Sequence, residues 1–446
     1  MEKKKKKRLE GIWDVKHMFE SSLIIFFIIG ALATTAVYYV NSDEQETSPP
    51  PLVHNAVNYD SLDGCDLFSG KWVYDNNSYP LYQELQCPYI PGEFACEQHG
   101  RINSNYQQWR WQPHACNLPR FDAREVLERL RGKRVIFVGD SVNRNQWISM
   151  VCMLQTVIPI GLKKMQKVAN ASLFSFKAFV SGSTRLFYDL SVYTTITSLQ
   201  QRYTYINTNI QEYDVSIDFY WAPLLVESNA DHPAKHKRNE RVVHVQSIEN
   251  HAKNWVNADV LVFNSYLWWG TPTLKILYGS SEDAKESNIV SNHRGYRMVL
   301  KIWSNWLRTH INHTRTRSYF MSMTATHKRG ADWGKEGNAN CLNETEPIMK
   351  DGFWESGSDM KMMRILELSL NKLKAKGVNV QMMNITQLTQ YRKDAHPSIH
   401  RLFYSALKAK QLSNPLNYAD CTHWCLPGVP DIWNELLLTY ILRGVK

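Results

Sequence analysis

The sequence predicts an α/β protein: a parallel sheet with helices on both faces, preceded by a disulfide-stapled, loop-rich segment and an N-terminal transmembrane helix. Three observations carry this prediction. Short apolar strands alternate with helical patterns after residue 120, all eight cysteines follow residue 60, and one uncharged apolar run lies near the N-terminus. Strands that alternate with helices are typical of parallel sheets. With 446 residues, 43% of them hydrophobic, the chain can bury a substantial core.

The apolar run covers residues 22–40 and contains no charged side chain. At about 1.5 Å per residue a helix of this length comes close to spanning a hydrocarbon core of about 30 Å. Lys3 to Arg8 precede it, so residues 1–21 are predicted to be a cytoplasmic tail, with the rest of the chain lumenal. A cleaved signal peptide is the alternative, since Ala31-Leu32-Ala33 has the character of a cleavage site. The anchor is favoured because the apolar run continues past that point.

The composition excludes few partners by itself. The formal charge is +10, but a good part of it belongs to the N-terminal basic run. No basic helix or base-stacking motif accompanies the charge, so nucleic acid is not expected as a partner. A mildly basic lumenal domain fits an anionic ligand or a wall polymer. The 15 Trp and 22 Tyr suit stacking on sugar rings or the filling of a bulky core.

Glycosylation sequons and cysteines agree with a lumenal address. In an oxidising compartment an even number of cysteines favours disulfides, and four bridges could form in about 105 pairings. Five asparagines are followed two residues later by Ser or Thr and are candidate glycosylation sites. They are Asn76, Asn170, Asn312, Asn343 and Asn384.

The chain divides by composition into further segments. Residues 41–60 are polar, acidic and contain Pro49-Pro50-Pro51, as in an extended stem. Residues 61–120 are rich in Cys, Trp, Tyr and Pro and predict a stapled, loop-rich subdomain. Residues 121–446 are predicted to form the α/β catalytic domain. Its expected helices cover 124–130, 145–154, 291–310, 358–376 and 431–442, and its expected strands cover 134–138, 259–263, 319–323 and 378–383.

The sharpest local signal is VIFVGDSVNRNQ at residues 135–146, a buried strand followed by Gly139-Asp140-Ser141 and a helix start. Residues placed there lie at the carboxyl edge of a parallel sheet, where α/β folds bind ligands. Gly139 permits a tight turn, and the helix N-terminus offers free N–H groups to an oxyanion. The alternative is that Ser141 only caps the helix.

A second block, residues 418–428, places Asp420 and His423 just before the last helix. A serine hydroxyl needs a base to take its proton, and an imidazole needs a carboxylate to set its tautomer. Asp-x-x-His supplies both, and Cys421 and Cys425 would stiffen the loop. The alternative is a zinc site made by Cys421, His423 and Cys425, which a lumenal thiol pair disfavours.

A third block, VLVFNSYLWWG at residues 260–270, is a strand followed by a loop. Asn264 is expected at the same sheet edge as Ser141, where its amide could donate to an oxyanion, although an ordinary turn residue would also fit. Tyr266, Trp268 and Trp269 offer flat faces to a glycan, with simple core packing as the alternative for each.

These blocks occur in the order found in SGNH/GDSL-type esterases. GDSVNRNQW, FNSYLWW, THKRGADWG, NITQLTQYRKDAHPS and DCTHWCLPGVPDIWNELL resemble the plant trichome-birefringence-like family, the polysaccharide O-acetyltransferases of the Golgi. The resemblance covers nearly all of the chain from Cys65 onward. One departure is Met323-Thr324-Ala325-Thr326-His327, where many relatives read Ser-Pro-Thr-His, which bears on acceptor specificity.

The resemblance implies an acetyl-enzyme at Ser141, with His423 as the base and Asp420 orienting it. It places Arg144 beside the nucleophile, and we assign Arg144, Gly139 and Asn264 to oxyanion or acyl contact. It also implies disulfides Cys65–Cys116 and Cys87–Cys152, and leaves Cys96 and Cys341 for Cys421 and Cys425; we assign these as Cys96–Cys425 and Cys341–Cys421.

The expected function is therefore acetyl transfer to a plant cell-wall polysaccharide in the Golgi membrane, with xylan O-2 or O-3 as the first choice of acceptor. The alternatives are an acetyl-esterase, an acetyltransferase for mannan, xyloglucan or pectin, and a non-catalytic glycan-binding protein. No dinucleotide fingerprint, Walker loop or metal signature occurs in the sequence, so no bound cofactor or metal is expected. An acetyl donor is required, and its identity and any protein partners are left open.

Overall fold

The computed structural model describes residues 62–168, 172–179, 213–233, 240–279, 286–403, 407 and 409–443. These residues belong to one compact unit, Val57–Lys446. The predicted tail, transmembrane anchor and stem, and the sequon at Asn170, lie outside the described residues. Within the described ranges, no helix combines the length and the apolar character needed to cross a bilayer.

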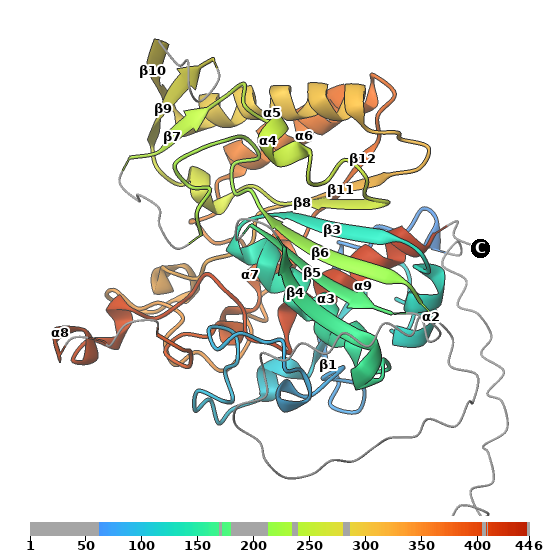
Figure 1. Cartoon of the computed structure of the whole chain (residues 1–446). Helices are drawn as coiled ribbons and strands as arrows, with labels where there is room; N and C mark the ends of the chain where they lie inside the picture. The colour runs from blue at the N-terminus through green and yellow to red at the C-terminus, as the bar shows by residue number, and fades with distance from the viewer. Residues whose placement is uncertain are drawn as a thin grey trace, which may run out of the picture. The chain divides into compact units, whose positions relative to one another are not determined.

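A seven-stranded sheet forms the centre of the fold, in the order β12-β11-β8-β3-β6-β5-β4 (Figure 1). The five strands from β12 to β6 are parallel to one another. The predicted strands correspond to four of them. The bounds are β3 (Arg134–Gly139), β4 (Lys163–Val168), β5 (Leu173–Ala178), β6 (Val215–Trp221), β8 (Val260–Phe263), β11 (Arg317–Met321) and β12 (Val380–Met383).

The sheet is mixed rather than purely parallel, which corrects the predicted architecture. Strand β5 runs antiparallel to both β6 and β4. Strand β4 is the edge strand and carries Lys163, Lys164 and Lys167. An edge strand has a neighbouring strand on one side only, and lysines on it block pairing with another molecule. Such a strand therefore lacks the continuous apolar run of a buried strand. That composition hid the hairpin from pattern analysis.

Helices cover both faces of the sheet, as predicted (Figure 1). On one face lie α2 (Ala123–Arg129), α3 (Ser141–Gln155) and α9 (Val429–Leu442), and on the other α4 (Glu249–Ala252), α5 (Asn292–His310) and α6 (Met360–Lys374). Two short helices, α7 (Thr386–Gln390) and α8 (Ala409–Leu412), belong to the loops. The short 3₁₀ turns are η3 (Glu84–Gln86), η4 (Asn105–Gln107), η5 (Ile160–Leu162), η7 (Leu267–Trp269), η8 (Gly330–Trp333), η9 (Lys393–Ala395) and η10 (Pro415–Asn417).

Alternating side chains of β3 separate two hydrophobic cores. Val135 and Phe137 enter the first core, with α2, α3 and α9. Ile136 and Val138 enter the second core, with α4, α5 and α6. This is the two-sided burial that makes a central parallel strand read as a continuous apolar run.

Helix α3 begins at Ser141, four residues before its predicted start. The Asp140 side chain caps it by accepting a hydrogen bond from the Val142 N–H at 2.9 Å. Both Val142 and Asn143 are buried, as are nearly all residues of this helix. A helix buried all round shows no polar face, so its periodicity does not mark where it begins.

The Cys-rich segment contains a two-stranded antiparallel sheet, formed by β1 (Gly70–Tyr74) and β2 (Trp109–Pro113), and otherwise consists of loops and short 3₁₀ turns. It has no separate core: Leu67, Trp72 and Phe94 share the first core with α3 and α9. A second small sheet, not predicted, joins β7 (Val242–His244), β9 (Thr273–Tyr278) and β10 (Glu286–Ser291) over the start of α5.

The cysteines form four disulfides: Cys65–Cys116, Cys87–Cys152, Cys96–Cys425 and Cys341–Cys421. The first two are the pairs that the family resemblance implies, and the last two are the pairs that we assigned among the remaining cysteines. Because Cys421 and Cys425 are both oxidised, the alternative zinc site at His423 is wrong. Across the described residues, no group of three or more His, Cys, Asp or Glu side chains is arranged to hold a metal ion.

Candidate active site

Ser141 is presented at the carboxyl end of β3, in the first turn of α3. The turn before it requires glycine, since a Cβ on Gly139 would lie 2.5 Å from the Asn264 carbonyl oxygen. The β3–β8 register pairs Val138 with Phe263, so Asn264 follows at the same edge of the sheet. Both predicted sheet-edge residues therefore lie together because two parallel strands end at the same level.

The three predicted catalytic side chains form one hydrogen-bonded chain. The Nε2 atom of His423 lies 2.7 Å from the Oγ atom of Ser141, and its Nδ1 atom lies 2.8 Å from Oδ2 of Asp420. Since a carboxylate only accepts, Nδ1 carries the proton and leaves Nε2 free to accept from the serine. This is the geometry of an activated serine nucleophile.

Asp420 is held as a carboxylate. Burial alone would raise its pKa, but the charge and hydrogen bond of His423 and the charge of Arg401 outweigh it and hold the pKa well below its usual range. Arg401 forms an ion pair with the same Oδ2 atom. The Oδ1 atom of Asp420 accepts from the N–H groups of Thr422 and His423 at 3.0 and 3.1 Å. An ionised, oriented carboxylate stabilises an imidazolium beside it.

The loop that carries His423 is tied to the rest of the molecule on both sides. Its disulfides reach Cys96 in the Cys-rich segment and Cys341 in the loop after β11. The Trp424 N–H donates to the Asn145 side chain in α3 at 2.8 Å. Asn145 thereby joins the helix of the nucleophile to the loop of the base.

A chain of histidines supports the same loop from behind. The His396 Nδ1 atom donates to the carbonyl of His423 at 2.7 Å, and His327 Nε2 lies 2.8 Å from the carbonyl of Gln390. Between the rings, His327 Nδ1 and His396 Nε2 are 2.7 Å apart. Burial lowers the pKa of both histidines. His327 belongs to the segment that departs from its relatives, and it is placed beneath the catalytic loop.

Asn264 and Arg144, two of the residues assigned to oxyanion or acyl contact, differ in the contacts that they make. Asn264 is buried, and its Oδ1 atom has no hydrogen-bond partner among the described residues. Arg144 forms an ion pair with Glu93 of the Cys-rich segment and lies over the Phe94 ring. Burial lowers the pKa of Arg144 to about 10, which still leaves it charged at neutral pH. The Cys-rich segment therefore contributes a carboxylate and an aromatic ring to the site.

Several supporting residues were not singled out from the sequence. Glu93, Asn145, Arg401 and His396 are single polar side chains from the Cys-rich segment, helix α3 and the segment after α7. Asn145 and His396 lay within quoted motifs, GDSVNRNQW and the DAHPS stretch, but nothing in those motifs marked them as supports of the triad, and no local spacing connects Glu93 or Arg401 to Ser141. Asp140 was known only as part of Gly-Asp-Ser; burial raises its pKa to about 6 while the Val142 N–H and His423 act against the rise.

The prediction that three aromatic side chains bind glycan is wrong for Trp269. Its side chain is 0% exposed, donates to Ser265 at 2.9 Å and packs against Tyr296. Trp268 is half-buried, with the Arg241 guanidinium over its ring. Tyr266 is half-buried and accepts from the Asp359 N–H at 3.2 Å. Glycan contact therefore stays a prediction only for Tyr266 and Trp268.

The described sequons differ in accessibility. Asn76, Asn312 and Asn343 are exposed, whereas Asn384 is half-buried. Attachment of a glycan needs an accessible side chain, so the first three remain the better candidates.

Comparison with known proteins identifies two matching family models. Residues 118–440 match the GDSL/SGNH-like acyl-esterase family found in Pmr5 and Cas1p. Residues 63–117 match the PMR5 N-terminal domain. The boundary between the two matches falls just after Cys116, at the end of the Cys-rich segment.

Individual relatives match over most of the chain. Protein trichome birefringence-like 34 of Arabidopsis thaliana is 48% identical over 387 residues, covering 86% of each protein. Xylan O-acetyltransferase 12 of Oryza sativa subsp. japonica is 46% identical over 389 residues, 86% of this chain and 71% of the relative. Protein trichome birefringence-like 35 of Arabidopsis thaliana is 43% identical, over 84% of this chain and 76% of the relative.

Proposed function

The chain belongs to the GDSL/SGNH-like acyl-esterase family found in Pmr5 and Cas1p, and from that premise we propose that it is an O-acetyltransferase acting on a plant cell-wall polysaccharide, with xylan as the acceptor. The observation that carries the proposal is the Ser141–His423–Asp420 chain, with contacts of 2.7 and 2.8 Å. Its xylan acceptor is supported by relatives named xylan O-acetyltransferases at 43–46% identity.

In the first half of the reaction the enzyme takes up the acetyl group. Ser141 Oγ attacks the acyl carbon of the donor while His423 Nε2 takes the hydroxyl proton. The negative charge on the former carbonyl oxygen is met by the Ser141 N–H at the start of α3 and by the Asn264 amide. The imidazolium, stabilised by Asp420, then gives its proton to the departing group, and Ser141 is left as the acetyl ester.

In the second half a sugar hydroxyl replaces the donor. His423 Nε2 takes the proton of that hydroxyl as its oxygen attacks the acetyl carbon. The bond to Ser141 Oγ breaks, and the proton returns to the serine. Water can follow the same route, so transfer depends on the acceptor holding a hydroxyl about 3–3.5 Å from the acyl carbon.

The mechanism is tested by mass spectrometry of the full-length chain. After incubation with acetyl coenzyme A or 4-nitrophenyl acetate, the peptide that contains Ser141 should gain one acetyl group. The variant Ser141→Ala should show no gain and no transfer to xylohexaose. Acetylation elsewhere, or unchanged turnover by Ser141→Ala, contradicts the nucleophile.

The transferase assignment is tested separately from the mechanism. With xylohexaose present, the products should be acetylated oligosaccharide rather than free acetate. Release of acetate alone would identify an esterase. Manno-oligosaccharide, xyloglucan and pectin fragments serve as matched acceptors, and a preference for any of them over xylohexaose would overturn xylan.

We further propose that the enzyme is a single-pass Golgi protein with residues 22–40 as anchor, residues 1–21 cytoplasmic and the catalytic part lumenal. Four disulfides and three exposed sequon asparagines support an oxidising lumen. Protease treatment of sealed Golgi vesicles should remove a tag at the N-terminus and spare one at the C-terminus. The reverse pattern contradicts this orientation.

A further inference from the structure

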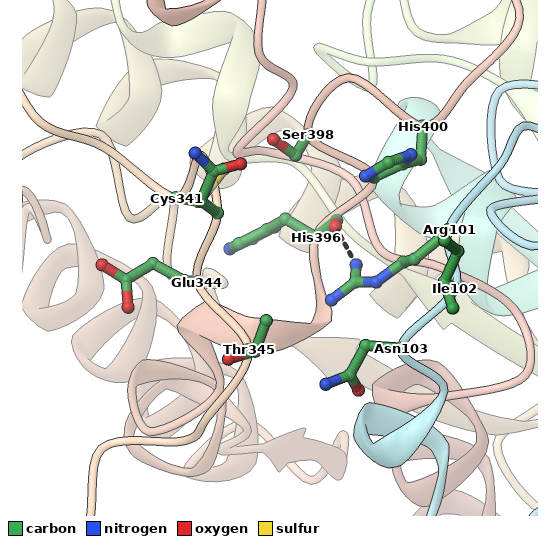
Figure 2. A pocket seen from close by; sticks show the side chains of 10 residues that line it. Arg101, Ile102, Asn103, Cys341, Glu344, Thr345, His396, Ser398 and His400 are labelled. Atoms are coloured by element: carbon green, nitrogen blue, oxygen red, sulfur yellow. Dashed lines mark hydrogen bonds between the residues drawn. The ribbon is translucent and has the colours of Figure 1, made fainter.

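A pocket of about 160 Å³ lies beside the loop that carries His423, here called the base loop, on the side of His396 (Figure 2). Its mouth is accessible to solvent, since the lining residues Ile102 and Asn343 are exposed. The polar side chains that line it come from the Cys-rich segment and from two loops of the catalytic domain. They are Arg101, Asn103, Asn343, Glu344, Thr345, His396, Ser398 and His400.

The wall of the pocket carries an excess of positive charge. Both carboxylate oxygens of Asp394, which is fully buried, accept hydrogen bonds from Arg392, at 3.0 and 2.9 Å. Arg101, 8% exposed, has no acidic side chain within ion-pair distance in the described part of the chain and donates only to the Asp394 and His396 carbonyls and the Cys425 sulfur. Two guanidinium groups against one carboxylate leave one positive charge at the wall.

The remaining lining also favours a negatively charged ligand. Ser398 Oγ is buried and has no hydrogen-bond partner among the described residues. His400 Nδ1 donates to the His99 carbonyl at 3.4 Å. The only acid in the lining, Glu344, accepts from Trp333 at 2.9 Å and forms an ion pair with Lys393, and in Figure 2 its carboxylate points away from Arg101.

The pocket is mechanically connected to the catalytic base. Arg101 Nη1 donates to the His396 carbonyl at 2.5 Å (Figure 2), and His396 Nδ1 donates to the His423 carbonyl at 2.7 Å. The backbones of Ser398 and Asp420 exchange two hydrogen bonds of 3.0 and 2.9 Å. A ligand in the pocket would therefore touch side chains that hold the base loop.

We propose that this pocket is a carboxylate-binding site, separate from the Ser141 centre. The guanidinium of Arg101 faces the carboxylate, and hydroxyl and amide groups of Ser398, Thr345 and Asn103 complete its hydrogen bonds. Two sources share this chemistry: a uronic acid unit on the acceptor polysaccharide, and free acetate. The first source rests on the proposed function, whereas binding itself can be measured without acetyl transfer.

Binding is measured by ligand-observed NMR on the full-length chain with two pairs of probes. Methyl β-D-glucuronoside is compared with methyl β-D-glucoside, and sodium acetate with acetamide. Each pair differs in the carboxylate charge. We expect at least about tenfold tighter binding of one carboxylate than of its neutral partner, the effect of one charge pair in a partly buried site.

Variants place the binding in the pocket rather than at Ser141. Asn103→Asp keeps the oxygen that accepts from the Asn105 N–H at 2.9 Å but adds a negative charge to the wall. It should weaken carboxylate binding about tenfold. Asn105→Asp adds the same charge two residues away, outside the lining, and should leave binding unchanged. Ser398→Ala removes a hydroxyl without a partner in the structure and should weaken binding several-fold without changing the melting temperature.

The outcomes separate cleanly. A preference for glucuronoside supports an acidic sugar unit, and a preference confined to acetate supports a small free carboxylate. Equal binding of charged and neutral probes, or an equal response of Asn103→Asp and Asn105→Asp, overturns the site. Failure of acetyl transfer with intact carboxylate binding would instead contradict the proposed function.

Discussion

The two faces of the central sheet are held together in different ways. On the first face, the core contains Cys87, Cys96, Cys152 and Cys425, and Cys65 and Cys116 pack against it. The core of the second face contains no cysteine among the described residues and is built around tryptophans, with Trp303 packed edge-on against Phe263 and Trp306 edge-on against Trp255.

Chain connectivity explains this difference. Apart from Ile136 and Val138 of β3, the second core is assembled from successive strand–helix units between residues 220 and 380, so most of its contacts close comparatively short loops. The first core joins the Cys-rich segment and the C-terminal helix; its Cys96–Cys425 bridge spans 329 residues. The conformational entropy lost on closing a loop grows with its length, and a disulfide removes part of that loss from folding. The longest of these closures therefore carries a covalent link.

The active site lies on the side with the long closure. Ser141 and His423 are 282 residues apart in the chain and meet at 2.7 Å. A base presented by a loop rather than by a regular element needs rigid support. Two disulfides tie the loop that carries His423 to distant segments, whereas no disulfide lies in the second core among the described residues.

The largest expected effect comes from breaking the longest bridge. In Cys96→Ser/Cys425→Ser the free energy of unfolding should fall by about 6 kcal/mol on the chain-entropy estimate. Transfer activity of the remaining folded protein should also fall, because the base loop loses its link to the Cys-rich segment. Chemical denaturation and kcat measure the two effects.

The matched control is Cys65→Ser/Cys116→Ser, whose bridge spans 51 residues and does not touch the base loop. It should lower the free energy of unfolding by about 4 kcal/mol but leave kcat per folded molecule unchanged. Equal losses of kcat in both double variants would remove the positioning role.

A smaller effect is expected on the second face. Trp303→Leu leaves a cavity without breaking a hydrogen bond, since the Trp303 Nε1 atom has no partner among the described residues. The free energy of unfolding should fall by about 2–3 kcal/mol, with kcat unchanged at a temperature where the protein is folded. A fall in kcat beyond the folded fraction would show that the second face also positions the site.

A smaller effect is expected from breaking the contact between α3, the helix that carries Ser141, and the base loop. Asn145→Ala leaves the Trp424 N–H buried without its acceptor, which costs about 1–3 kcal/mol in stability. We expect kcat to fall about tenfold with KM unchanged, because the loop loosens without loss of acceptor contacts. Gln146→Met, at the neighbouring buried position, is the control and should keep its kcat.

The smallest effect is a pH dependence confined to the first face. Burial raises the pKa of Glu435 to about 8, and its carboxylate lies 2.8 and 2.9 Å from the Tyr79 hydroxyl. The raised pKa means that the folded protein holds a proton that the unfolded chain loses above about pH 4. Stability from this group is therefore complete below that pH, declines as the pH rises and is gone above about 8.

Denaturation at several pH values tests this sign. Glu435→Gln should reduce the decline in stability between pH 5 and 8 by up to about 1 kcal/mol per pH unit. Glu249→Gln, exposed at the start of α4 on the other face, should leave the slope unchanged. A decline that persists in Glu435→Gln would assign it to other groups, such as Asp431, whose pKa is raised to about 7 by burial.

The sequence was sufficient for elements with a strong local signal. The strands at residues 134–138 and 259–263, and the amphipathic helices at 291–310 and 358–376, appear where the apolar spacing predicted them. The triad residues could be named because Gly-Asp-Ser and Asp-x-x-His are short motifs whose chemistry is apparent locally. The predicted strand–helix order placed Ser141 and Asn264 at one sheet edge.

Other features depended on contacts that no local pattern records. The β4–β5 hairpin is charged and lies at an edge, the start of α3 is buried on all sides, and Trp269 reads like an exposed aromatic but fills the second core. Glu93, Asn145 and Arg401 support the triad from separate segments, so their roles exist only after the chain has closed on itself.

The sequence by itself determined which residues could perform acyl chemistry and the strand–helix order that delivers the nucleophile to a sheet edge, because periodicity and motif chemistry are local properties. Only the tertiary structure decided that the imidazole meets the hydroxyl, that the Cys-rich segment shares the catalytic core, and that a buried guanidinium faces a pocket. Those are consequences of closing loops of up to 329 residues, and distances across such loops are set by packing and disulfides rather than by neighbouring residues.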